Sequence, residues 1–352
     1  MDISAKITGV KYKPFLCRKL NVYDFENLDK ALSKDATFII NIDDKNQIAI
    51  SWWVSAKRTR SYPYARVYDS LGFAGKKVTI IPIFKDEGKE GDRDFLQWDT
   101  VSLMSLLGVY VIIGYYVDAS QSTRYKQKIT DQRFDINYIN SQITKILSYQ
   151  SDALHWNLAE IDKVKEIGNK ALESYQNISK KLSVDMHSLS SAKKKIEELM
   201  KDKATFMNSS RGLAQKAQKR ESVTIQPKEL LLGTKATLTI KNYLGGDYYF
   251  TSDEVKIEKD NLFLIEGKHT KEAKLPALED IKDGLLKMIL FTNLKDVKVD
   301  GREYNPIAVL KLTTGKDFNL KLIKESQKEM LNILKKEAEE NNFRIMVNEY
   351  FY

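Results

Sequence analysis

The stretch SDEVKIEKDNLFLIEGKHT, residues 252–270, decides the fold of the C-terminal part of the chain. Two runs rich in Val, Ile, Leu and Phe flank the dipeptide Asp260-Asn261, and this pattern is typical of a β-hairpin with a tight turn. We expect one strand over residues 254–259 and the second strand over residues 262–268.

The position of the turn fixes which side chains face one another across the hairpin. The expected pairs, outward from the turn, are Lys259 with Leu262, Ile257 with Leu264, Val255 with Glu266, and Asp253 with Lys268. Because side chains alternate between the two faces of a strand, all of these positions share one face. The inner part of that face is apolar, and its open end carries Asp253, Glu266 and Lys268.

Two carboxylates and a lysine beside an apolar strand pair suggest a catalytic or metal-binding site. Charged groups next to a core are usually paired or bind a metal. Two neighbouring acids repel each other, and a hard cation such as Mg²⁺ relieves that repulsion with one or two carboxylates plus substrate phosphate oxygens as ligands. A lysine there can orient a water molecule or stabilise charge on a phosphate. The trio therefore predicts Mg²⁺-dependent phosphodiester hydrolysis.

The same residues resemble a known signature. Asp253 followed by Glu266-Gly267-Lys268 resembles the PD-(D/E)XK nuclease motif, in which an acid precedes Glu-x-Lys on the next strand. The resemblance implies that Asp253 and Glu266 hold the metal and that Lys268 positions the attacking water. Ser252 stands where the proline of the motif would be.

The elements expected around the motif extend the resemblance over residues 226–352. They are a strand at 235–242, the hairpin, a helix at 275–291, a strand at 307–312, a helix at 319–340 and a strand at 343–350. The order is β-β-β-α-β-α-β. A meander followed by a helix and a further strand is the shared core of the PD-(D/E)XK family.

Length and patterning predict an α/β (α+β) protein with three regions. Residues 1–125 are expected to form an α/β region with a possible role in DNA recognition, with strands at 36–40, 47–54, 77–84 and 109–116. Residues 126–205 are expected to be a helical connector or a dimerisation region. Residues 206–352 are expected to form a nuclease domain, a mixed sheet flanked by helices.

Composition sets bounds on partners and compartment. The 57 Lys+Arg against 48 Asp+Glu give a net charge of +9, which fits a nucleic-acid partner and equally fits a lysine-rich composition without functional meaning. The single cysteine, Cys17, excludes an internal disulfide and a cysteine-based zinc site. No phosphate-binding loop of the GxxxxGK[ST] type occurs, so we expect no nucleotide cofactor.

The sequence predicts a cytoplasmic protein without a membrane segment. Its first residues lack the apolar core of a signal peptide. The uncharged run at 101–117 is short for a membrane span and divides into a helix and a buried strand.

Two further groups of residues are candidates for function. Candidates for DNA contact are Arg58, Arg60 and Arg66, which are interleaved with tyrosines, and Lys271 and Lys274 just beyond the second hairpin strand. A solvated basic loop explains the arginines equally well. The acidic cluster Asp92, Asp94 and Asp99 weakly resembles the acidic residues of a nuclease core, but we interpret it as an ordinary loop and helix start.

The resemblance implies a Mg²⁺-dependent, site-specific endonuclease of double-stranded DNA, similar to type II restriction endonucleases. Such enzymes usually act as homodimers, since a palindromic site has two-fold symmetry. Alternatives are a defence or repair nuclease acting on non-palindromic, damaged or branched DNA, a catalytically dead DNA-binding protein, and a structural protein built on the central helices. The trio itself could also be a surface salt-bridge ladder, as we expect for Glu254, Lys256 and Glu258 on the opposite face.

Overall fold

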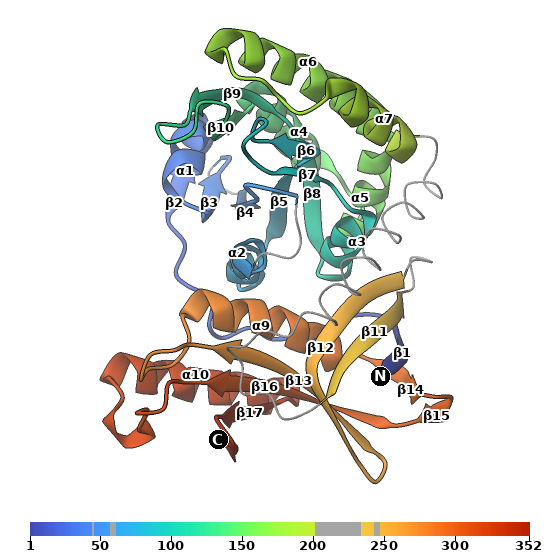
Figure 1. Ribbon diagram of the computed structural model, residues 1–352, viewed down its shortest axis with the longest axis vertical. Coiled ribbons are helices and arrows are strands. Elements are labelled where there is room, and N and C mark those ends of the chain that lie inside the picture. Colours follow the sequence, from blue (N-terminus) through green and yellow to red (C-terminus); the bar gives the residue numbers. More distant parts are fainter. Residues whose placement is uncertain (44–45, 57–60, 201–233, 243–246) are drawn as a thin grey trace. The chain divides into compact units, whose positions relative to one another are not determined.

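The computed structural model describes residues 1–43, 46–56, 61–200, 234–242 and 247–352, which are coloured along the chain in Figure 1. The chain divides into two compact units. Unit 1 combines Met1–Lys19 with Arg211–Tyr352, and unit 2 is Leu20–Ser210. Both units contain helices packed with mixed sheets, so the expected α/β (α+β) class is confirmed.

This division differs from the three regions expected from the sequence. The first residues of the chain belong with the C-terminal unit, and the helical residues 126–205 belong to the same unit as the N-terminal sheet. Both differences arise from contacts between segments that are far apart in the sequence.

Unit 1 is built on a nine-stranded sheet with the order β15-β14-β1-β11-β12-β13-β16-β17-β18. Its strands are β1 (Asp2–Ile7), β11 (Thr234–Asn242), β12 (Asp247–Glu258), β13 (Asn261–His269), β14 (Lys295–Val299), β15 (Arg302–Glu303), β16 (Asn305–Thr313), β17 (Arg344–Val347) and β18 (Tyr350–Phe351). Its helices are α9 (Leu278–Phe291), α10 (Glu325–Asn341) and the short 3₁₀ helix η2 (Leu320–Leu322).

The predicted order β-β-β-α-β-α-β is confirmed by β11, β12, β13, α9, β16, α10 and β17. Strands β11, β12 and β13 form an antiparallel meander, and β16 and β17 add to it in parallel. Each parallel crossover carries a helix, as such connections usually do. The sequence interpretation missed β1, which pairs in parallel with β11, and the β14–β15 hairpin that follows α9.

The hairpin of β12 and β13 forms as predicted, but the predicted pairing was wrong by two positions. Glu258 pairs with Asn261, so the turn is Lys259-Asp260, and Lys259 adopts a left-handed φ of 56°. Val255 therefore faces Leu264, and the expected pairs of Lys259 with Leu262, Ile257 with Leu264, Val255 with Glu266 and Asp253 with Lys268 do not form. A shift of two positions leaves every side chain on its predicted face.

The charged face of the hairpin is only partly a surface ladder. Lys256 and Glu258 form an exposed ion pair at 2.5 Å, as predicted. Glu254 instead turns toward the buried Lys311 of β16, 3.5 Å from its Nζ atom, and Lys311 also lies 3.1 Å from Glu349. The ladder prediction was wrong for Glu254 because its carboxylate pairs with a lysine from another strand.

Helix α9 lies against β13 and β16 in unit 1 (Figure 1). Its apolar side chains Ile281, Leu285, Met288 and Ile289 are buried, as the helical spacing predicts. Gly284 faces the sheet, and a Cβ atom there would lie only 2.7 Å from Cδ1 of Leu310. The glycine therefore lets the helix backbone approach the strands closely.

The segment after β1 is held against α10 by one buried carboxylate. Glu337 accepts hydrogen bonds from the Tyr12 hydroxyl at 2.7 Å and from the backbone N–H groups of Phe15 at 2.9 Å and Leu16 at 3.0 Å. The carboxylate is fully buried, so these donors satisfy an otherwise costly charge. This contact attaches the N-terminal residues of the chain to its last long helix.

Unit 2 contains a five-stranded sheet with the order β2-β3-β4-β5-β8 and two small sheets. Its strands are β2 (Val22–Asp24), β3 (Thr37–Asn41), β4 (Gln47–Trp52), β5 (Lys76–Pro82), β6 (Phe84–Asp86), β7 (Arg93–Phe95), β8 (Val109–Gly114), β9 (Tyr116–Gln121) and β10 (Ile129–Phe134). The helices are η1 (Phe25–Asn27), α1 (Leu28–Lys34), α2 (Ser61–Leu71), α3 (Trp98–Leu106), α4 (Ile136–Ser148), α5 (Ala153–Asp162), α6 (Val164–Leu182) and α7 (Leu189–Met200).

The four predicted strands of unit 2 are confirmed as β3, β4, β5 and β8. The uncharged run at 101–117 divides into a helix and strands, and no helix in the described part of the chain has the length and hydropathy needed to cross a membrane. Residues 126–205 belong to unit 2 rather than to a separate connector, because α5 is bonded to β8, and their role in dimerisation stays a prediction. Trp156 Nε1 donates to the Val111 carbonyl at 2.8 Å, and Asn157 Oδ1 accepts from the Val111 N–H at 2.7 Å.

We expect Glu337→Ala to destabilise unit 1 strongly. The substitution leaves one buried and two half-buried donors without their acceptor. A fully buried unsatisfied donor costs about 1–3 kcal/mol and a half-buried one costs less, so a total of roughly 2–5 kcal/mol is expected. Urea denaturation of the purified chain measures the change. Glu340→Ala is the matched control on the same helix, because the exposed pair of Glu340 with Lys13 at 3.3 Å should contribute less than about 1 kcal/mol. Equal losses in the two variants would contradict a special role for Glu337.

Candidate active site

The structure brings the predicted trio together with two side chains from α9. Glu266 and Lys268 project from β13 on the face that α9 covers, and Asp253 comes from the adjoining strand β12. Glu266 is at the centre, because its Oε1 lies 2.9 Å from Lys268 Nζ and its Oε2 lies 2.8 Å from Lys287 Nζ. Asp283 forms a second ion pair with Lys268. Five charged groups therefore share one small, mostly buried region.

Asp253 is fixed at the edge of this group by the backbone of β13. Its Oδ2 accepts a hydrogen bond of 2.9 Å from the N–H of Gly267, the residue between Glu266 and Lys268. This bond aligns the carboxylate of β12 with the Glu-x-Lys segment where the regular ladder of the hairpin ends. The two carboxylates of the predicted trio therefore belong to one site.

Lys268 reaches the site underneath helix α9. A Cβ atom added to Gly284 would lie 3.1 Å from Cε of Lys268, so only glycine leaves full space for the lysine side chain there. The ammonium group then lies between the carboxylates of Glu266 and Asp283, with 14% of the lysine side chain exposed. This arrangement holds the charge of Lys268 in one place.

The pKa values of the site reflect strong burial together with dense charge. Burial acts to raise the pKa of Glu266, but the charges of Lys287 and Lys268 outweigh it and lower that pKa. Burial likewise acts to lower the pKa of Lys268, but the charges of Glu266 and Asp283 raise it. Glu266 is therefore ionised and Lys268 is protonated at neutral pH.

Asp253 behaves differently from its neighbours. Burial, followed by the negative charge of Glu266, raises the pKa of Asp253 to about 7. The two lysines lower it only in part. A carboxyl group with a pKa near neutrality at a cluster of charges is a typical property of a functional site.

The donors at this site suit Mg²⁺. Carboxylate oxygens of Asp253 and Glu266 are hard ligands, and the ion commonly takes one or two carboxylates together with water and phosphate oxygens. Burial is the main cause of the raised pKa of Asp253, and the charge of Glu266 adds a repulsion that a divalent cation would relieve. Thr251, two residues earlier on β12, has a buried hydroxyl without a hydrogen-bond partner among the described residues. Within those residues, no group of three or more His, Cys, Asp or Glu side chains is arranged to hold a metal.

Sequence reasoning missed Asp283 and Lys287. They stand four residues apart on α9, so they share a face of the helix. Their neighbours Ile281, Leu285 and Met288 are buried, which means that these two charges occur inside an apolar helix. Charged residues at such positions need partners, and this was the signal available in the sequence.

The predicted DNA-contacting residues that the structure describes belong to different units. Lys271 and Lys274 are exposed just after β13, and Lys274 pairs with Glu272 at 2.8 Å. Arg66 belongs to unit 2, where its guanidinium group lies 4.5 Å from the Trp52 ring centroid and donates to the Trp52 carbonyl at 2.7 Å. Arg58 and Arg60 lie outside the described residues. Contact with DNA stays a prediction for all five.

The acidic residues of unit 2 lie in a loop (Asp92), on a short strand (Asp94) and in a helix start (Asp99), so the loop interpretation was wrong for Asp94. Asp94 lies on β7 and accepts a hydrogen bond of 2.5 Å from the Ser55 hydroxyl. Asp99 occurs in the first turn of α3. The backbone of Asp92 is hydrogen-bonded to that of Glu87, whose carboxylate contacts Lys85 at 2.5 Å and Lys128 at 2.9 Å.

No protein-family model matches this chain, and neither the curated proteins nor the solved structures contain a significant match to it. The chemistry of the site therefore rests on the geometry described above and on the order of the elements that carry it.

We expect Asp253→Asn to stabilise the protein at alkaline pH. In the unfolded chain the carboxyl group titrates near pH 3.9, whereas in the folded chain its pKa is about 7, so the native state loses stability as the pH rises between these values. Asparagine removes this loss. Thermal melts should show Asp253→Asn at least about 2 °C more stable than the wild type at pH 8, which corresponds to a gain of at least roughly 0.5–1 kcal/mol in a domain of this size.

The advantage of Asp253→Asn should shrink as the pH falls toward 4, because the wild-type carboxyl group is then neutral as well. Addition of Mg²⁺ at pH 8 should stabilise the wild type more than the variant. Asp260→Asn is the control, since Asp260 is an exposed carboxylate in the turn of the same hairpin. A pH-independent difference between Asp253→Asn and the wild type would contradict the raised pKa.

Proposed function

We propose that the protein is a Mg²⁺-dependent DNA endonuclease that hydrolyses phosphodiester bonds. The observation that carries this proposal is the position of Asp253 and Glu266 beside Lys268, at the place where strands β12 and β13 separate. The resemblance to the PD-(D/E)XK motif supports the same assignment. So does the order of the meander, α9 and the parallel strand β16, which agrees with the shared core of that family.

Each charged group of the site has a role in this proposal. Asp253 and Glu266 would hold Mg²⁺, which would supply polarisation of phosphate oxygens and a lower pKa of a coordinated water. Lys268 orients the attacking water and stabilises negative charge that develops on the phosphate. Lys287 contacts the second oxygen of Glu266, at 2.8 Å, and helps to keep that carboxylate ionised in spite of its burial.

Asp283 is the positioning residue for Lys268. Its carboxylate and that of Glu266 hold the ammonium group from two sides, and Gly284 provides the space for the lysine chain. A catalytic group held in this way loses less freedom in the transition state than a mobile one. The cluster on β13 and α9 thus supplies both the reacting groups and their support.

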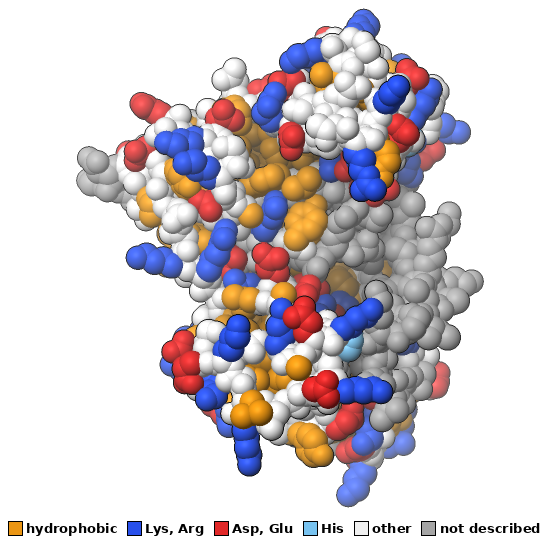
Figure 2. All heavy atoms as spheres, turned by 60° about the vertical axis from the view of Figure 1, so that its left-hand side comes forward, with side chains coloured by type: hydrophobic (Ala, Val, Ile, Leu, Met, Phe, Trp, Pro, Cys, Tyr) orange, Lys and Arg blue, Asp and Glu red, His pale blue; other side chains and the backbone are white. Residues whose placement is uncertain are grey.

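In the finer form of the proposal, the enzyme cuts a specific site in double-stranded DNA and acts as a homodimer, as type II restriction endonucleases do. A single active site cuts one strand, so cutting both strands at a palindrome requires two copies. The net charge of +9 favours a polyanionic substrate. On the face drawn in Figure 2, Lys and Arg are interspersed with Asp and Glu, so that face carries no broad basic patch. The alternative substrates are non-palindromic, damaged or branched DNA.

Cleavage of plasmid DNA with Mg²⁺ and with EDTA tests the proposal. We expect discrete Mg²⁺-dependent fragments from the wild type and a loss of at least about 100-fold in rate for Lys268→Ala and Glu266→Gln, since each removes a group that acts in the transition state. The exposed Lys321 of the same unit provides the control Lys321→Ala, which should cut normally.

The pattern of products distinguishes the forms of the proposal. A smear that is lost in both variants would retain the active site and favour a nonspecific or structure-specific nuclease. Failure to cut methylated and unmethylated plasmids alike, with DNA still bound, would overturn the enzyme proposal and indicate a catalytically dead DNA-binding protein. Thermal melts of both variants confirm that they are folded.

Asp283→Asn should reduce the cleavage rate by about tenfold and change its pH dependence. The substitution keeps an oxygen atom beside Lys268 but removes a charge that raises the pKa of the lysine. The alkaline limit of the pH–rate profile should therefore move to lower pH, which a purely structural effect would not produce. Glu279→Gln removes an exposed charge from the first turn of the same helix and should leave the profile unchanged. An unchanged cleavage rate for Asp283→Asn would exclude the positioning role.

A further inference from the structure

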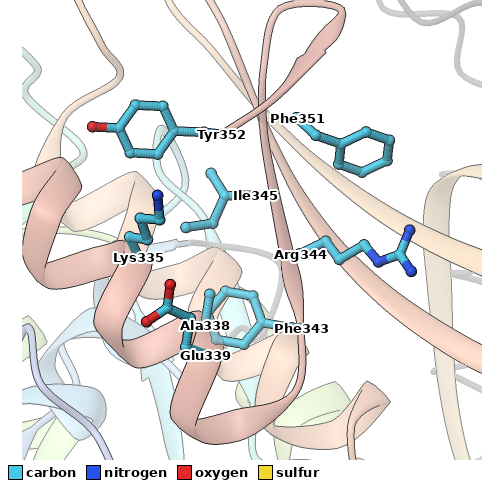
Figure 3. A pocket seen from close by; sticks show the side chains of 8 residues that line it. All are labelled: Lys335, Ala338, Glu339, Phe343, Arg344, Ile345, Phe351 and Tyr352. Carbon is cyan, nitrogen blue, oxygen red and sulfur yellow. The ribbon is translucent and has the colours of Figure 1, made fainter.

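The C-terminal hairpin of unit 1 borders a hollow of about 410 Å³ that the proposed active site does not use. The hollow lies between α10 and the strands β17 and β18, at the edge of the nine-stranded sheet. Its lining includes the aromatic rings of Phe343, Phe351 and Tyr352 together with the cations Lys335 and Arg344. Figure 3 shows these side chains around the last residues of the chain.

Two of the exposed aromatic rings of this hairpin line the hollow. Phe351 is 57% exposed and Tyr352 is 37% exposed, although large apolar side chains are normally covered. In Figure 3, Tyr352 stands on the side of Lys335, whereas Phe351 and Arg344 point to the other side.

Each ring is accompanied by a cation. Lys335 Nζ lies 5.4 Å from the ring centroid of Tyr352, and Arg344 Cζ lies 5.6 Å from that of Phe351. Neither Lys335 nor Arg344 forms an ion pair within the described part of the chain. The residues that line the hollow include one acid, Glu339, against these two cations. The edge is therefore both aromatic and positively charged.

We propose that this edge binds single-stranded nucleic acid. Bases stack on the free faces of Tyr352 and Phe351, and the phosphates between them contact Lys335 and Arg344. Exposed aromatic rings combined with cations that track a backbone are the means by which proteins hold single strands without reading their sequence. The ligand is thus distinct from the duplex at the proposed active site.

The charge of the edge favours a polyanion over a second copy of this chain. A second copy would bring its own Lys335 and Arg344 to a symmetric contact, where like charges would repel one another. A single strand supplies the complementary phosphates and the flat bases that the rings lack. The hollow also lies within the usual range of about 300–1,000 Å³ for small-ligand pockets, so one nucleotide can enter it.

Binding of fluorescein-labelled oligothymidylate in EDTA, followed by anisotropy, tests this proposal without any hydrolysis. An abasic oligomer of equal length carries the same phosphates but no bases, so we expect it to bind the wild type about tenfold more weakly. The double variant Phe351→Ala, Tyr352→Ala should lose that difference. Tyr350→Ala is the control, because Tyr350 is 79% exposed in the same hairpin but does not line the hollow.

The cations are tested separately through the salt dependence of binding. The double variant Lys335→Gln, Arg344→Gln should reduce the slope of log K against log salt by about 1.4, because each phosphate contact to a single strand contributes roughly 0.7. Phe351→Leu with Tyr352→Leu keeps the apolar cover while removing the rings, so a loss of base-dependent binding there cannot be attributed to misfolding.

Three results would overturn the proposal. The first is equal affinity of the wild type for the oligothymidylate and the abasic oligomer. The second is a loss in Tyr350→Ala as large as that in the Phe351 and Tyr352 variants. The third is a decrease of molar mass by light scattering on removal of the two rings, which would show that a second copy covers this edge.

Discussion

The burial of one ionised carboxylate, that of Glu266, is the constraint on which the rest of unit 1 depends. Only 2% of its side chain is exposed, and an isolated charge in that position would be prohibitively costly. It is tolerable because Lys268 and Lys287 lie within 2.9 Å on its two oxygens. One lysine comes from the same strand and the other from α9, so the ion pairs fix helix and strand relative to each other.

The close approach of α9 to the sheet depends on Gly284 and on the parallel pairing of the strands that α9 connects. Gly284 removes the side chain that would otherwise meet Leu310 and Lys268, and the parallel pairing of β13 with β16 requires a crossover connection, which includes α9. Segments from the start of the sequence complete the unit, since β1 extends the sheet and Glu337 holds the following residues on α10. The site is thus supported by contacts from both ends of the chain.

Local periodicity was sufficient to predict the hairpin, the helices and the shared face of Asp253, Glu266 and Lys268. The alternation of side chains has a period of two, so it survived an error of two positions in the register. The error itself came from the turn, where Lys259 adopts a left-handed conformation that residue preferences do not favour for lysine. Asp283, Lys287 and the pairing of β1 with β11 depend on tertiary contacts, which no local pattern contains.

Each unit contains a glutamate that contacts two lysines, and the two ion clusters differ in whether a second carboxylate lies beside the glutamate. Glu87 of unit 2, like Glu266, contacts two lysines, and although burial opposes this, Lys85 and Lys128 lower its pKa to about 2. The two lysines balance the charge of Glu87 within that cluster. At Glu266 the same arrangement has a second carboxylate beside it, and Asp253 is left with a pKa of about 7. Sequence selection for stability alone would remove a half-buried acid that repels its neighbour, so the presence of Asp253 supports the proposal that this site holds a cation.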